Sequence, residues 1–166
     1  MSPLRRSGPR VRRIRRGVYQ IRLPDEERAA LRTLCDELRE MLAAEDPSLS
    51  RLYPPAYTDD PAAADEYARL MRDDLTEGHL QAIETMERTL ESQRLDEDEM
   101  SGWLAALNDM RLALGTRLDV TEDMYESGMA PEDPRAPRFA VYQYLGYLEE
   151  QVVEAVARSL DARGGS

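Results

Sequence analysis

The sequence of 166 residues contains no lysine, one cysteine, one histidine and one phenylalanine. A single cysteine excludes a disulfide within the chain. The histidine and the cysteine lie far apart in the sequence, so the ligand spacings of a zinc site are missing, and the glycines do not form a phosphate-binding loop. We therefore expect a non-enzymatic protein that needs no metal and no cofactor.

Long apolar runs are missing as well. No stretch approaches the roughly 18 apolar residues that a membrane-spanning helix requires. No apolar signal segment follows the N-terminal arginines. We therefore expect no membrane partner and a cytoplasmic location.

Charge is distributed unevenly along the chain. The formal net charge is −11, yet residues 1–22 contain eight arginines and no acidic residue. The acidic remainder does not favour direct nucleic-acid binding, because phosphate contacts supply much of that affinity. The basic arm could contact nucleic acid, an acidic protein or its own domain, although such arms are most often solvated. We predict a flexible basic arm over residues 1–13, a single helical domain over 14–161 and a disordered tail over 162–166.

Hydrophobic periodicity predicts a mainly α fold, a bundle of four to five helices with a short N-terminal β-strand or hairpin. Side chains alternate in character over residues 18–23, and a hairpin with residues 11–15 would turn at Arg16-Gly17. Capping chemistry indicates where the helices begin. These starts lie at Pro24, Asp60-Pro61, Asp96 with Glu99, and Thr121.

Two of the predicted helices have apolar faces that constrain the packing. The helix after Asp60 either ends at Gly78 or continues to Leu90. Four of its apolar side chains are predicted to point inward: Tyr67, Leu70, Met71 and Leu75. The last helix, at about residues 137–161, has a wide apolar face, so we expect it to be central in the bundle.

The segment 103–118 is an amphipathic helix with one charge in its apolar stripe. Arg111 lies among leucines at helical spacing, and a guanidinium there requires a carboxylate or several carbonyls. We favour an internal polar network over a ligand site. The carboxylates considered as partners are Asp59, Asp60, Glu84 and Glu87.

A set of residues around this helix and the preceding loop forms our candidate for a partner-binding surface or a polar network. The loop at residues 51–61 is rich in proline and tyrosine, and its tyrosines could contact a partner or fold onto the bundle. The candidate set is Tyr53, Tyr57, Asp59, Asp60, Trp103, Asn108, Arg111 and Arg117.

Cys35 has two interpretations. Arg32 and Arg39 could stabilise a thiolate, which would make the residue a one-cysteine redox sensor. It also shares a face with the leucines of its predicted helix, where cysteine behaves as a small apolar residue. We favour the second interpretation. The leucines on that face are Leu31, Leu34, Leu38 and Leu42.

Three blocks of sequence resemble an actinobacterial family, the domain of unknown function DUF2017. These blocks are RLYPPAY followed by DD at residues 51–60, WLAALNDMRLALGTRL leading into VTED at 103–123, and YQYLGYLEEQVVEAV at 142–156. The resemblance implies an oxidative-stress regulator that contacts an extracytoplasmic-function sigma factor and promotes expression of cysteine-biosynthesis genes. In that branch, sensing is attributed to two cysteines four positions apart on one helix. Here Cys35 is followed at that spacing by Arg39, so this intramolecular switch does not carry over.

Together these observations favour a non-catalytic, stress-linked transcription regulator whose partner is a protein, with a sigma factor as the first candidate. The family's gene neighbourhood suggests an alternative, an adaptor in Clp-dependent proteolysis. A small-molecule sensor is a third alternative, and it would require an apolar cavity near Arg111. A homodimer is compatible with the same sequence.

Overall fold

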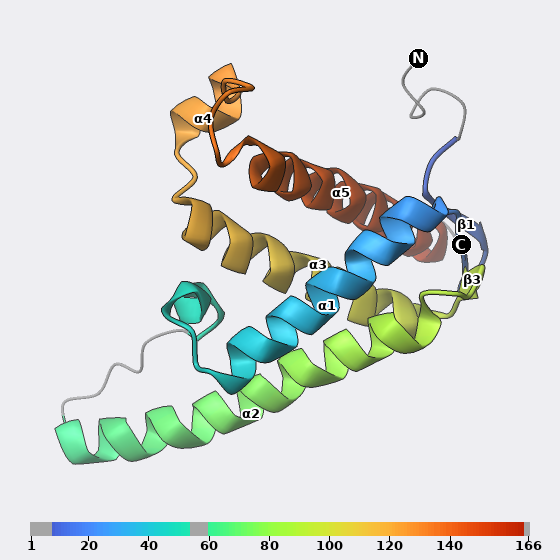
Figure 1. Ribbon diagram of the computed structural model, residues 1–166. Coiled ribbons are helices and arrows are strands. Elements are labelled where there is room, and N and C mark those ends of the chain that lie inside the picture. Colours follow the sequence, from blue (N-terminus) through green and yellow to red (C-terminus); the bar gives the residue numbers. More distant parts are fainter. Residues whose placement is uncertain (1–7, 54–59, 165–166) are drawn as a thin grey trace.

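The computed structural model describes residues 8–53 and 60–164, which form a helical bundle with a small sheet (Figure 1). The mainly α fold with an N-terminal hairpin is confirmed. In chain order the elements are β1 (Val11–Arg15), β2 (Val18–Ile21), α1 (Asp25–Ala43), the 3-10 helix η2 (Pro47–Leu52), α2 (Pro61–Thr89), β3 (Arg94–Leu95), α3 (Glu97–Leu118), α4 (Glu122–Ser127) and α5 (Ala136–Gly164).

The hairpin forms where the alternation predicts it. β1 pairs antiparallel with β2, with Val11 opposite Ile21, and the turn contains Gly17 at a φ of 75°. This left-handed conformation is one that glycine adopts without a steric penalty. β3 pairs with the other edge of β2, placing Tyr19 opposite Leu95. β3 has only two residues, too few for alternation to indicate a strand.

The predicted capping residues begin the helices. Asp60 accepts hydrogen bonds from the backbone N–H groups of Ala62 and Ala63. Asp96 and Glu99 form a reciprocal capping box, and Thr121 accepts from the Met124 N–H. These bonds satisfy N–H groups that have no partner inside the helix. α2 continues through Gly78 to Thr89 without a break.

α3 is the central helix, and our expectation that the last helix would be central is wrong. α3 contacts α1, α2, α5, η2 and β2, and Figure 1 shows α5 and α2 on its two sides. Residues on most of its circumference are buried, including Trp103, whose indole Nε1 donates to Thr89 Oγ1 at 2.7 Å. The periodicity identified apolar faces on both helices but not which helix has neighbours all around it.

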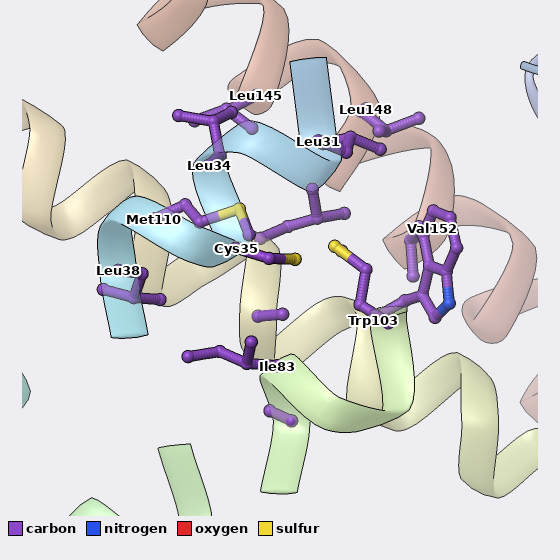
Figure 2. Close-up of a cluster of buried hydrophobic side chains, with 14 of the residues drawn as sticks. Leu31, Leu34, Cys35, Leu38, Ile83, Trp103, Met110, Leu145, Leu148 and Val152 are labelled. Atoms are coloured by element: carbon purple, nitrogen blue, oxygen red, sulfur yellow. The ribbon is translucent and has the colours of Figure 1, made fainter. Parts of the chain in front are cut away.

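Side chains from four helices meet in the core (Figure 2). Leu31, Leu34, Cys35 and Leu38 come from α1, Ile83 from α2, Trp103 and Met110 from α3, and Leu145, Leu148 and Val152 from α5. The predicted inward face of α1 is therefore confirmed. A Cβ on Gly102 would lie 2.7 Å from Thr85 Cγ2, so glycine permits the close approach of α3 to α2.

The first turns of α2 do not point their apolar side chains into this core, and the prediction that they do is wrong. Tyr67 is 55% exposed, Leu70 62% and Met71 39%, whereas Leu75 is half-buried. Figure 1 shows this end of α2 extending beyond the end of α1. Periodicity reports that a face is apolar, but not that another element reaches it.

Both predicted ends of the domain need correction. Val11–Arg15 is strand β1, and the side chain of Arg10 is 2% exposed, so residues 10–13 belong to the folded part and not to a flexible arm. Arg10 Nη2 lies 2.8 Å from Glu27 Oε2, and Arg10 Nε also donates to that carboxylate. The Val11 N–H donates to Gln151 Oε1, which ties β1 to α5. At the other end α5 continues to Gly164, past the predicted start of the tail.

Replacing Arg10 by alanine is expected to lower the free energy of unfolding by about 3 kcal/mol, because Glu27 would remain as an uncompensated, largely buried carboxylate. Urea unfolding measures this change. Arg12→Ala is the matched control, since Arg12 is exposed on β1, two residues after Arg10, and should change stability by less than about 0.5 kcal/mol. Equal effects of the two substitutions would contradict the buried ion pair.

Candidate functional site

The predicted site residues do not gather in one place. Trp103 is completely buried in the core, and Asp60 is the cap of α2. Arg117 reaches across to Asp46, with Nη2 2.8 Å from Oδ2. Tyr57 and Asp59 lie outside the described residues. The candidate set is therefore divided among separate positions.

Arg111 pairs with Glu149 of α5, not with any of the four carboxylates considered from the sequence. Arg111 Nε lies 2.9 Å from Glu149 Oε2, in an ion pair that lacks hydrogen-bond alignment. The side chain of Arg111 is 32% exposed, so the guanidinium is half-buried at the edge of the stripe. Burial raises the pKa of Glu149, and the charge of Arg111 opposes this rise.

Small residues allow α3 and α5 to approach at this pair. A Cβ on Gly146 would lie 3.9 Å from Arg111 Cδ, and a Cβ on Gly115 would lie 3.0 Å from the Tyr142 ring. Asn108 lies about one turn before Arg111 on α3 and is half-buried. The arrangement is a contact between α3 and α5 in which Arg111 is paired with Glu149.

A second polar cluster joins η2, α2 and α3, and the sequence reasoning missed it. His79 Nδ1 lies 2.6 Å from Asp109 Oδ2, and His79 Nε2 lies 3.3 Å from the Leu52 carbonyl oxygen. Asp109 is buried and His79 is largely buried. A doubly protonated imidazole satisfies both acceptors, because each ring nitrogen then donates. We call this arrangement the His79 clamp.

Tyr53 packs onto the clamp. Its hydroxyl lies 2.6 Å from Thr76 Oγ1, and its ring meets the His79 ring edge to face, with centroids 5.7 Å apart. The guanidinium of Arg72 stacks over the same ring at 4.1 Å. Tyr53 therefore folds onto the bundle, which is one of the two placements left open from the sequence.

The surroundings of His79 favour its protonated form. The hydrogen bond to Asp109 raises the pKa of His79, burial opposes the rise, and the Asp109 charge adds to it. A raised pKa in the folded protein means that protonation stabilises the fold. The signal available in the sequence was that His79 is the chain's only histidine, whereas the apolar periodicity gives no indication that Asp109 is buried.

Asp109 and Arg111 project from nearly opposite sides of α3. Residues two positions apart on an α-helix are separated by about 200° of rotation about its axis, so Asp109 and Arg111 cannot face the same neighbouring helix. Asp109 meets His79 of α2, and Arg111 meets Glu149 of α5. The block at residues 103–123 is thus connected to Leu52 and Tyr53 of the first block and to Glu149 of the third.

Cys35 lies in the core and is not exposed. Burial raises the pKa of its thiol to about 12, so the thiolate is scarce at neutral pH. The arginines that could have stabilised a thiolate have other partners. Arg32 pairs with Glu91 and Arg39 with Glu87.

An apolar groove lies between α1 and α3, bordered by the start of α5. Its apolar lining consists of leucines, methionines and Ala113, and Glu37, Arg117 and Arg138 line its rim. Arg111 is not among its lining residues, so this groove is not the cavity near Arg111 that a small-molecule sensor would require. Arg138 donates two hydrogen bonds to Glu37 across the rim.

Within residues 8–53 and 60–164, no helix has the length and apolarity needed to cross a membrane. In the same ranges, no three His, Cys, Asp or Glu side chains are grouped so that they could hold a metal ion.

Comparison with known proteins gives a family and a set of relatives. The family model described as "Domain of unknown function (DUF2017)" matches residues 5–156. The chain is 33% identical over 129 residues to the "Putative oxidative stress regulator AosR" of Mycobacterium leprae, which covers 68% of this chain and 59% of that protein. It is 33% identical over 126 residues to the "Oxidative stress regulator AosR" of Mycobacterium tuberculosis, covering 65% and 57%. The chain thus spans less than two thirds of these relatives, and no solved structure matches it.

The pKa of His79 should lie above 6.5, the usual value for histidine. In Asp109→Asn the pKa should fall to 6.5 or below, because burial remains but the carboxylate is gone. NMR detection of the single imidazole follows this titration directly. Unfolding should show the same linkage. The stabilisation is complete below pH 6.5 and is lost as the pH rises through the folded pKa. Glu122→Gln on exposed α4 is the control, and equal titration of His79 in both variants would contradict the clamp.

Arg111→Leu should lower the free energy of unfolding by about 1–3 kcal/mol at pH 7, because the largely buried carboxyl group of Glu149 then loses its partner. Converting both Arg111 and Glu149 to leucine should recover most of this loss. Arg117→Leu is the control on the same helix, since its more exposed pair with Asp46 is worth at most about 1 kcal/mol. A double variant less stable than Arg111→Leu would refute the pairing.

Proposed function

This chain belongs to the DUF2017 family, and we propose that it is a non-catalytic, stress-linked regulator that acts in the cytoplasm by binding a sigma factor. The observation that carries the proposal is the 33% identity to proteins named oxidative stress regulator. Sigma-factor binding extends the proposal beyond those names, and it rests on the family resemblance of the three sequence blocks.

The distribution of polar groups supports action through surfaces. The buried charged groups Arg10 and Asp109 each face a partner of opposite charge within the fold. Such pairs organise the bundle and are not directed at a substrate. The acidic body also complements a basic protein surface, which would accelerate association.

Purified extracytoplasmic-function sigma factors from the source organism, each immobilised in turn, provide the direct test. We expect one of them to bind the full chain, and soluble chain in excess to compete for it. Affinity capture from cells with and without peroxide then asks whether the same sigma factor is recovered. Recovery of a Clp component, with no sigma factor or polymerase subunit in either assay, would overturn the proposal in favour of the adaptor alternative.

Cys35→Ala should leave sigma-factor affinity within about twofold, both with and without peroxide, because the thiol is buried and protonated. In the native protein, a thiol-reactive disulfide reagent should label Cys35 at least about 100-fold more slowly than in the urea-unfolded chain. Rapid native labelling would contradict the buried, protonated thiol, and loss of a peroxide response in Cys35→Ala would instead establish a one-cysteine sensor.

A further inference from the structure

The N-terminal end of α2 carries apolar side chains that the described part of the fold leaves exposed. We call residues 61–71 the α2 overhang. All of its residues except Ala64 are exposed. Tyr67, Leu70 and Met71 are separated by three and four positions, so they lie on one face of the helix. This spacing is the one by which helices anchor on a protein partner.

The charges next to this apolar face are mostly acidic. At about 100° of rotation per residue, four exposed carboxylates fall beside or within the apolar face: Glu66, Asp73, Asp74 and Glu77. Asp65, Arg69 and Arg72 fall on the other side of the helix. Arg72 is already engaged, because its guanidinium stacks on Tyr53 and its Nε lies 3.5 Å from Glu45 Oε1. The surface around the apolar face is therefore negative.

This charge pattern selects among the occupants that could cover the face. A second copy would bring two acidic strips together, and like charges across a helix pair are destabilising. A segment with basic residues flanking an apolar face would match both the apolar side chains and the carboxylates. The complementarity therefore favours a different, basic protein over a homodimer through this face.

The base of the overhang is firmly positioned. Thr76 and His79 follow the overhang on α2. Thr76 is hydrogen-bonded to Tyr53, and His79 is bound to Asp109 of α3. Asp60 caps the opposite end. The face is thus presented on a helix fixed at its base, which limits the conformational entropy lost on binding.

We propose that Tyr67, Leu70 and Met71 of α2 form the docking surface for an amphipathic helix of a protein partner, whose apolar face is flanked by arginine or lysine. The inference rests on the proposed function in one respect, since it takes the partner to be the sigma factor. The surface itself is defined by exposure and charge.

The test uses the full chain with Tyr67→Ser and Leu70→Ser combined. Both side chains are exposed, so circular dichroism and the melting temperature should stay those of the wild type. The matched control combines Tyr125→Ser and Val153→Ser, whose side chains are 59% and 48% exposed on α4 and α5. The probe is a fluorescent synthetic helix with leucines on one face and arginines beside them. A sister peptide carries glutamate in place of each arginine.

In fluorescence anisotropy we expect the arginine peptide to bind the wild type and the control alike, and to bind the overhang variant at least about tenfold more weakly. The glutamate peptide should not bind, and raising the salt from about 50 to about 300 mM should weaken the arginine peptide. Equal binding of both peptides, no binding of either, or equal affinity for the overhang variant would overturn the docking surface. A wild-type dimer in sedimentation that the overhang variant abolishes would also overturn it, by identifying a second copy as the occupant.

The same variants separate this inference from the proposed function. A sigma factor that binds the wild type and the control but not the overhang variant supports both. A sigma factor that binds all three proteins equally leaves the proposed function standing and overturns the docking surface as its site. If no sigma factor binds but the peptide results hold, the proposed function fails and the basic-helix surface stands.

Discussion

Two opposite charges on α3, two residues apart, set the arrangement of the bundle. Asp109 and Arg111 leave the helix on nearly opposite sides, and each lies at the edge of the buried surface. Leaving either without a partner would cost free energy, so a cationic group must approach from one side and an anionic group from the other. His79 of α2 and Glu149 of α5 meet these demands, which places α3 between α2 and α5 (Figure 1).

The same pairs connect the three blocks of sequence that resemble the family. The middle block supplies both charges, the first block supplies the Leu52 carbonyl and Tyr53 to the His79 clamp, and the third supplies Glu149. The blocks therefore describe a scaffold whose polar groups are used internally. Under the proposed function, recognition of a partner is left to exposed surfaces, and the α2 overhang is an apolar surface of this kind bordered by acidic side chains.

Local chemistry could be predicted from the sequence, whereas long-range pairing could not. Asp60, Asp96 and Thr121 begin helices because capping involves neighbours two or three residues away. The position of Arg111 in an apolar stripe predicts a carboxylate or several carbonyls as its partner, but periodicity does not specify that Glu149, 38 positions later, supplies the carboxylate. The prediction of a solvated arm at Arg10 follows from the richness of this end in arginine, whereas the hydrogen bond of Arg10 to Glu27 joins the residue before β1 to the first turn of α1 across 17 positions. Periodicity predicts that Tyr67 and Leu70 point inward because they lie on an apolar face, but it does not reveal whether another element covers that face.

Hydrogen–deuterium exchange of the native protein, resolved by residue, tests most directly whether α3 organises the fold. If it does, the amides of α3 between Trp103 and Leu114 exchange only when the whole protein unfolds, so their protection equals the global stability. The amides at residues 65–71, in the exposed end of α2, should exchange through local opening at a much lower free energy. Protection that is greatest in α2 or α5, with α3 opening separately, would contradict this account.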